Sequence, residues 1–142
     1  METTTKKSNV LYTARTHTTG GREHGLSRSS DGHLEVRLST PGTDGVGTNP
    51  EQLFAAGWSA CFEGAMQVVA RKRNIHLPAD TVIDAEVDLC MEKGQFYLQA
   101  RLNVSIPGLD KTIAYEIVEA SREVCPYSKA IRNNIKVDYN VL

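Results

Sequence analysis

The feature that most constrains this chain is a long, largely apolar stretch between residues 53 and 69. Thr48-Asn49-Pro50-Glu51 precedes it, a Thr-x-x-Glu pattern typical of a helix start with a capping box. The stretch is apolar on nearly every side of a helix and rich in small residues, namely Ala55, Ala56, Gly57, Ala60, Gly64 and Ala65. We therefore expect a long, central, buried helix that runs to about Asn74.

Strand patterns lie on both sides of this helix. Residues 10–18 have strand composition, Gly20-Gly21 interrupts them, and a second strand is expected at residues 34–38. Apolar residues alternate through residues 83–91 and, after a Lys-Gly turn, through residues 96–106. This alternation predicts a long antiparallel hairpin with one buried face.

A second helix and a last strand complete the pattern. Asp110 can cap a helix that continues to Val124, where Cys125-Pro126 ends it, and residues 135–141 have strand composition. The order of strands, helix, hairpin, helix and strand predicts an α+β fold with helices against antiparallel sheets. Without a repeat or a composition break, we expect one domain over residues 1–142, with residues 1–9 as a flexible N-terminus.

Charge and cysteine content narrow the classes of function. The net charge of −1 gives no long-range attraction to nucleic acid or anionic lipid, and the polar N-terminus resembles neither a signal peptide nor a membrane span. We expect a cytoplasmic protein with no nucleic-acid or membrane partner. Three cysteines do not suit a secreted disulfide scaffold, and four histidines lie scattered rather than at metal-ligand spacing. Redox chemistry without a metal is therefore the leading hypothesis.

Two of the cysteines form a candidate redox pair. Cys61 lies in the middle of the predicted buried helix, and Cys125 lies at the end of another helix, where a turn of the chain can present it to the first. The alternative is that both are small packing residues, and spacing alone leaves both interpretations open. Cys90 belongs to the polar face of its strand, so we expect a solvent-facing thiol outside any catalytic site.

A nucleophilic Cys61 must be a thiolate, so its pKa must be lowered. The dipole of its own helix fades within the first turn and does not reach it. Arg22, after Gly20-Gly21, is the cation best placed by residue type, and Glu51 can hold its guanidinium through a fork of hydrogen bonds. One subunit cannot easily satisfy both contacts, so we expect a homodimer in which Arg22 and Glu51 of one chain meet Cys61 of the other. The plainer alternatives are a solvated Arg22 and a Glu51 that only caps the helix.

Three motifs carry a family resemblance. They are Asn49-Pro50-Glu51-Gln52-Leu53-Phe54-Ala55-Ala56-Gly57 with Ser59-Ala60-Cys61-Phe62, Val124-Cys125-Pro126-Tyr127-Ser128, and Gly20-Gly21-Arg22. With these motifs, the chain from about Val10 onward resembles the organic hydroperoxide resistance (Ohr) proteins of the Ohr/OsmC superfamily. The OsmC branch is the nearest alternative, but its helix motif usually has a histidine before the cysteine and it lacks the Cys-Pro-Tyr-Ser and Gly-Gly-Arg elements.

The resemblance implies an intertwined homodimer with an active site at each subunit interface. Each site would use Cys61 as peroxidatic cysteine, Cys125 as resolving cysteine, and Arg22 and Glu51 beside them. The implied activity is reduction of alkyl and fatty-acid hydroperoxides to alcohols in oxidative-stress defence. The implied reductant is a dihydrolipoyl group on a lipoylated protein, with no bound metal or other cofactor.

Two departures from the family pattern affect the expected pocket. Trp58 stands where the family commonly has tyrosine, and Arg22-Glu23-His24-Gly25 differs from the usual Arg-Asp-Gly. Phe54, Trp58 and Phe62 surround Cys61 in sequence and are expected either to line an apolar substrate pocket or to be ordinary core residues. Two other functions stay open: a redox sensor or binding protein whose disulfide switches a partner, and a structural dimer without activity.

Overall fold

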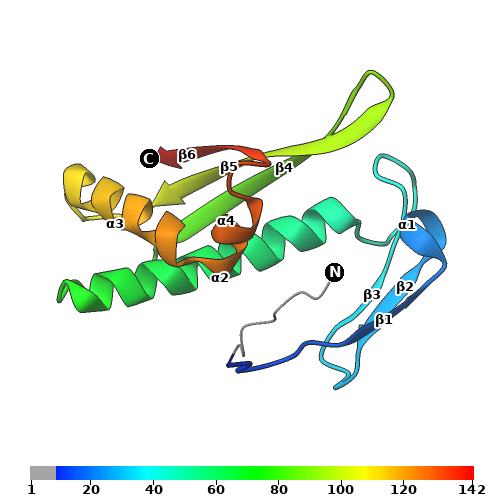
Figure 1. The fold of residues 1–142 in the computed structure, drawn as a ribbon, viewed down its shortest axis with the longest axis horizontal. Helices are drawn as coiled ribbons and strands as arrows, with labels where there is room; N and C mark the ends of the chain where they lie inside the picture. The colour runs from blue at the N-terminus through cyan, green and yellow to red at the C-terminus, as the bar shows by residue number, and fades with distance from the viewer. Residues whose placement is uncertain (1–8) are drawn as a thin grey trace, which may run out of the picture. The chain divides into compact units, whose positions relative to one another are not determined.

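The computed structural model describes residues 9–142, so all but the last residue of the predicted flexible N-terminus lies outside the described residues. The chain divides into two compact units, the first ending at Pro50 and the second spanning Glu51–Leu142. The first unit contains β1 (Thr16–Thr19), α1 (Gly21–His24), β2 (Leu26–Ser29) and β3 (Glu35–Arg37), coloured blue to cyan in Figure 1. Its strands form an antiparallel sheet in the order β1-β2-β3.

The first sheet differs from the predicted strands in two ways. The first strand begins at Thr16 rather than near residue 10, and the additional strand β2 lies between the two that were expected. Gly20 and Gly21 explain why the first strand ends at Thr19, because both adopt left-handed backbone conformations with φ of 77° and 70°. Glycine takes this conformation without steric cost, so the chain reverses through α1 and pairs back on β1.

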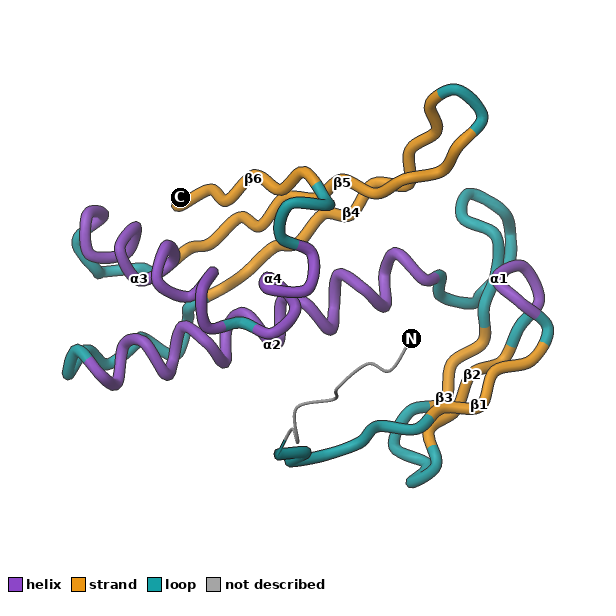
Figure 2. The backbone as a smooth tube through the Cα atoms, viewed as in Figure 1, coloured by secondary structure: helices purple, strands orange, loops and turns teal. Residues whose placement is uncertain are grey.

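The second unit is built on a long helix and a three-stranded sheet. Its helices are α2 (Pro50–Lys72), which begins at the boundary, α3 (Lys111–Val124) and α4 (Pro126–Ile131). Its strands are β4 (Val82–Glu92), β5 (Gln95–Ser105) and β6 (Lys136–Val141), in the order β4-β5-β6. Figure 1 and Figure 2 show the helices of this unit gathered on one face of the sheet. The α+β class with two small sheets and a long central helix is confirmed.

The last strand runs parallel to its neighbour, which corrects the expectation of purely antiparallel sheets. β6 pairs with β5 from Gln99 opposite Lys136 to Val104 opposite Val141. Parallel neighbours need a long crossover connection, and α3 and α4 supply it. Asp110 starts this crossover as predicted, because its carboxylate accepts hydrogen bonds from the N–H groups of Thr112 and Ile113.

α2 is buried along one face only, whereas its composition predicted burial on nearly every side. Trp58, Phe62 and Met66 follow one another at helical spacing, are fully buried, and join the core with residues of α3 and β5. The opposite face exposes a stripe of small apolar residues, Ala56, Ala60, Gly64 and Val68. By length and composition α2 could also span a bilayer, but the core helix of a globular domain meets the same criteria.

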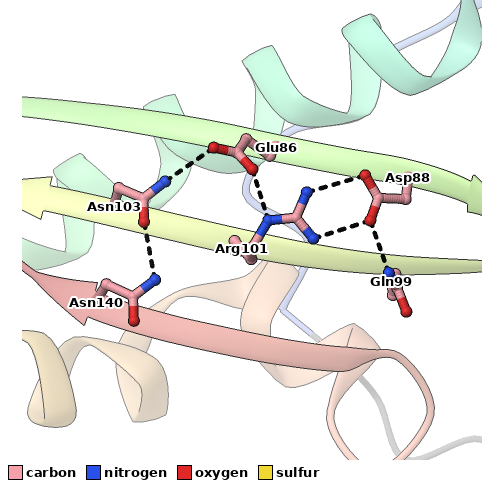
Figure 3. A network of polar contacts seen from close by, with 6 residues as sticks. All are labelled: Glu86, Asp88, Gln99, Arg101, Asn103 and Asn140. Atoms are coloured by element: carbon pink, nitrogen blue, oxygen red, sulfur yellow. Dashed lines mark hydrogen bonds and ion pairs between the residues drawn. The ribbon is translucent and has the colours of Figure 1, made fainter.

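The far face of the second sheet carries a polar network, drawn in Figure 3. Arg101 donates to both carboxylate oxygens of Asp88 at 2.9 and 3.0 Å and to Glu86 at 2.6 Å. The guanidinium of Arg101 and the amide of Gln99 hold the pKa of Asp88 down at about 2. Beyond the start of β6 at Lys136, the β4–β5 hairpin continues alone toward its turn (Figure 2), and Phe96 near this turn is 69% exposed.

Candidate active site

The structure brings the two predicted redox cysteines together. The Sγ atoms of Cys61 and Cys125 lie 3.5 Å apart, and both thiols are free. Cys61 is half-buried on α2, and Cys125 is fully buried at the junction of α3 and α4. A disulfide requires about 2.05 Å between the sulfurs, so closure needs an approach of about 1.5 Å. Cysteines 64 positions apart in the sequence are therefore close to bonding distance.

The local sequence explains how Cys125 reaches this position. Its N–H donates to Ser121 O at 2.9 Å as the last bond of α3, and its φ and ψ of −65° and 119° are extended. Pro126 requires this, because the residue before a proline is driven out of the helical conformation. Pro126 then occupies the first position of α4, where its missing N–H costs nothing. The Cys-Pro pair therefore ends one helix, starts the next and leaves the thiol between them.

Two successive main-chain N–H groups of α4 face the two sulfurs. The N–H of Tyr127 donates to Cys61 Sγ, and the N–H of Ser128 donates to Cys125 Sγ at 3.5 Å. Burial is the largest influence on Cys61 and raises the pKa of its thiol; the Tyr127 hydrogen bond opposes this, and the neighbouring Cys125 adds to it. The pKa of Cys61 therefore lies above its ordinary value, and an added positive charge is needed to favour the thiolate.

The three aromatic residues predicted around the cysteine have different environments. Trp58 and Phe62 are fully buried and pack against Tyr139 of β6, with ring centroids 6.3 and 5.7 Å from it. Phe54 is only partly buried and meets Tyr127 edge to face at 6.2 Å. Of the three, Phe54 thus retains exposed ring surface, whereas Trp58 and Phe62 belong to the core.

Tyr127 is a further residue beside the thiols; its residue type does not indicate this place, although it lies within the Cys-Pro-Tyr-Ser motif. The residue is 42% exposed, and its ring lies over Gly57, one helical turn before Cys61. A Cβ added at Gly57 would come within 3.0 Å of the Tyr127 hydroxyl. The glycine thus leaves the space that the tyrosine ring occupies beside the thiols.

Comparison with known proteins agrees with this geometry. The model of the OsmC-like protein family matches residues 41–140. The organic hydroperoxide resistance protein of Xanthomonas axonopodis pv. citri is 48% identical over 132 residues, which cover 90% of this chain and 92% of that protein. This chain belongs to the organic hydroperoxide resistance group of the OsmC family.

Solved structures of Ohr proteins share the whole fold. The crystal structure of OhrB from Bacillus subtilis aligns with a TM-score of 0.88 at 40% identity, covering 94% of this chain and all of that one. An organic hydroperoxide resistance protein from Legionella pneumophila aligns with a TM-score of 0.86 at 42% identity, covering 94% of this chain and 98% of that one. The Ohr fold therefore extends over both units of the chain.

The other two predicted site residues of this Ohr chain lie at the start of helices. Arg22 belongs to α1 of the first unit, directly after the left-handed Gly20 and Gly21. Glu51 lies in the first turn of α2, and it is half-buried. Their predicted meeting with Cys61 across a subunit interface stays a prediction.

Cys90 has surroundings of another kind. It lies on β4 directly opposite Tyr97 of β5, and it is half-buried rather than fully solvent-facing because this ring is its neighbour. The thiol of Cys90 is the main cause of a raised pKa for Tyr97. Within residues 9–142, no group of three or more His, Cys, Asp or Glu side chains is arranged to hold a metal ion.

Proposed function

We propose that this Ohr chain is a cysteine-based peroxidase that reduces organic hydroperoxides, such as alkyl and fatty-acid hydroperoxides, to alcohols. The observation that carries the proposal is the pair of free thiols, Cys61 and Cys125, 3.5 Å apart with a main-chain N–H directed at each sulfur. Related proteins named for organic hydroperoxide resistance support the same substrate class.

In the proposed cycle the Cys61 thiolate attacks the terminal oxygen of the hydroperoxide. The O–O bond breaks, the alkoxide takes a proton and leaves as the alcohol, and Cys61 becomes a sulfenic acid. The Cys125 sulfur then attacks the Cys61 sulfur, water leaves, and a disulfide forms. A dithiol reductant restores both thiols, and we propose a dihydrolipoyl group of a lipoylated protein in this role, in the cytoplasm.

Activation of Cys61 is proposed to come from a second subunit. Because burial raises the pKa of Cys61, a cation is needed, and Arg22 held by Glu51 of the partner would supply it. The exposed stripe of Ala56, Ala60, Gly64 and Val68 on α2 supports a homodimer, because small side chains let another helix approach closely. The same guanidinium would stabilise charge developing on the departing alkoxide.

Substrate choice is proposed to depend on the exposed aromatic surface beside the thiols. Phe54 is partly exposed there and contacts the partly exposed Tyr127 ring on one side and the buried Trp58 ring on the other, at centroid distances of 6.2 and 6.0 Å. Apolar surface of this kind favours a hydroperoxide with a hydrocarbon group over hydrogen peroxide.

The test is steady-state reduction of cumene and linoleate hydroperoxides with dihydrolipoamide as donor. Wild type is compared with Cys61→Ser, Cys125→Ser and Cys90→Ser. We expect Cys61→Ser to abolish turnover, Cys125→Ser to stop recycling after one turnover, and Cys90→Ser to match wild type. Loss of activity in Cys90→Ser with full activity in Cys125→Ser would overturn the pairing.

Two further results of this experiment would contradict parts of the proposal. Formation of the disulfide without multiple turnovers by any dithiol would favour a redox sensor over an enzyme. Full activity of a species that sediments as a monomer would overturn the role of a partner's Arg22 and Glu51.

A further inference from the structure

Ser128 lies at a junction of three elements behind the thiol pair. Its side chain is almost fully buried, at 3% exposure. Its Oγ accepts a hydrogen bond from the indole N–H of Trp58 on α2 at 3.1 Å, and another from the Tyr139 hydroxyl on β6 at 3.2 Å. The side chain of Ser128 therefore ties the start of α4 to the core from two directions.

The main chain of the same residue contacts the sulfur of Cys125, the proposed resolving cysteine. The N–H of Ser128 donates to Cys125 Sγ, so one residue binds the core through its hydroxyl and the thiol through its backbone. The anchoring groups are themselves packed. Trp58 is fully buried, and the Tyr139 ring contacts Phe62 and the Arg122 guanidinium, which lies 4.4 Å from the ring centroid.

We propose that Ser128 is a positioning residue for the resolving step: its anchorage by Trp58 and Tyr139 keeps Cys125 Sγ within closing distance of Cys61. This inference rests on the proposed function. Ser128 contacts no reacting atom through its side chain, so it acts through the placement of Cys125.

The position of Cys125 decides between two competing reactions of the Cys61 sulfenic acid. In the productive step Cys125 sulfur attacks the Cys61 sulfenic acid, the S–S bond forms, and the sulfenic oxygen leaves as water. In the competing step a second hydroperoxide oxidises the sulfenic acid to sulfinic acid and is itself reduced to the alcohol. Because intramolecular attack depends on the distance and direction of approach, a less firmly held Cys125 gives the second peroxide more time.

The test separates the resolving step from the first oxidation. Reduced protein is mixed with one or with fifty equivalents of cumene hydroperoxide, quenched at intervals and alkylated, and the forms of Cys61 are counted by intact-mass and peptide mass spectrometry. Wild type is compared with Ser128→Ala, which removes the acceptor, and Ser128→Thr, which retains it. Ser59→Ala is the matched control, because the Ser59 hydroxyl donates to Ala55 O within its own helix.

We expect Ser128→Ala to consume the first equivalent at the wild-type rate but to form the disulfide about tenfold more slowly. With excess peroxide it should accumulate Cys61 sulfinic acid, whereas Ser128→Thr and Ser59→Ala should stay close to wild type. A loss of folding alone would not produce this division, because it would slow the first step as well. Disulfide formation at the wild-type rate in Ser128→Ala, without extra sulfinic acid, would overturn the inference.

Tyr139→Phe gives a second measurement should Ser128→Ala fold poorly. It keeps the ring that packs on Phe62 and removes only the hydroxyl that donates to Ser128. We expect a smaller slowing of disulfide formation, about threefold, with the first step unchanged, and a wild-type rate would count against the inference. If wild type itself forms no Cys61–Cys125 disulfide, the proposed function fails, whatever the Ser128 variants do.

Discussion

The thiols of this protein occupy two contrasting environments. Cys61 and Cys125 lie among helices, belong to the core or pack against it, and each accept a main-chain N–H. Cys90 lies on β4, opposite Tyr97, near the turn of the β4–β5 hairpin, where β6 no longer pairs with β5. The surroundings of a thiol therefore distinguish a candidate redox cysteine from a cysteine outside the site. Cys61 and Cys125 each have a second sulfur and an amide donor nearby, whereas Cys90 has an aromatic ring.

Substituting one phenylalanine in each environment compares how much the packing there contributes to the free energy of unfolding. Phe62 follows Cys61 and is fully buried, whereas Phe96 precedes Tyr97 and is largely exposed. Phe62→Ala should lower the free energy of unfolding by about 3–5 kcal/mol, because it leaves a cavity in the core. Phe96→Ala should change it by less than about 0.5 kcal/mol. Urea unfolding of the reduced variants measures both, and equal losses would remove the contrast.

Oxidation should affect the two environments differently. Closing the Cys61–Cys125 disulfide joins residues 64 positions apart, which should raise the free energy of unfolding by about 2–4 kcal/mol. Cys90 should remain available to iodoacetamide throughout. Urea unfolding before and after one equivalent of hydroperoxide, with alkylation of each form, tests this. Protection of Cys90 on oxidation would place it in the redox pair and contradict the assignment.

The acidity of the two kinds of thiol should depend differently on Arg22. Burial raises the pKa of Cys61, and the proposed guanidinium lowers it, so Arg22→Met should reduce Cys61 oxidation at pH 7 about 100-fold. Since the thiolate is the reactive form, the rate should rise at higher pH in the variant, and the difference between the two proteins should narrow toward pH 10.

Stopped-flow oxidation between pH 6 and pH 10 measures this profile. Alkylation of Cys90 serves as the internal reference, because it should not respond to the substitution. An unchanged profile for Cys61 would show that Arg22 does not activate it.

The smallest effect should come from the polar face that carries Cys90. Arg101 holds the pKa of Asp88 at about 2, below its ordinary value of 3.8. This lowered pKa contributes stability above about pH 4 that is lost as the pH falls toward 2. Asp88→Asn should therefore lower stability slightly at neutral pH, since a partly exposed ion pair contributes little, and should then lose less stability between pH 4 and pH 2. Thermal melts across this range would reveal an equally steep loss in the variant if Asp88 were not responsible.

Local signals made much of the fold predictable. The Asp110 cap, the Cys-Pro break and the alternation through β4 and β5 each act over a few residues, and the structure has all three. The parallel direction of β6 was not predictable in this way. Alternation shows that a strand has one buried face, but it does not name the neighbour or the direction of pairing.

The site was predictable by residue type but not in its detail. Cys61 and Cys125 were identified as a pair, and their approach to 3.5 Å agrees with that interpretation. The amide donors at Tyr127 and Ser128 could not be predicted from residue type, because every residue except proline has a main-chain N–H and only the fold determines where it points. The exposed apolar stripe of α2 has the composition of a core face, so composition alone predicted burial on every side.

Gly57 is a residue that selection for thermal stability alone would replace. A glycine within a helix costs about 1 kcal/mol relative to alanine, so a screen for heat resistance would favour the substitution. Yet the added methyl group would press on the ring of Tyr127, whose own backbone holds Cys61. The central helix thus keeps a residue of low helix propensity where the Tyr127 ring beside the thiol pair needs space, and thermostabilised forms of this protein should be checked first for alanine at position 57.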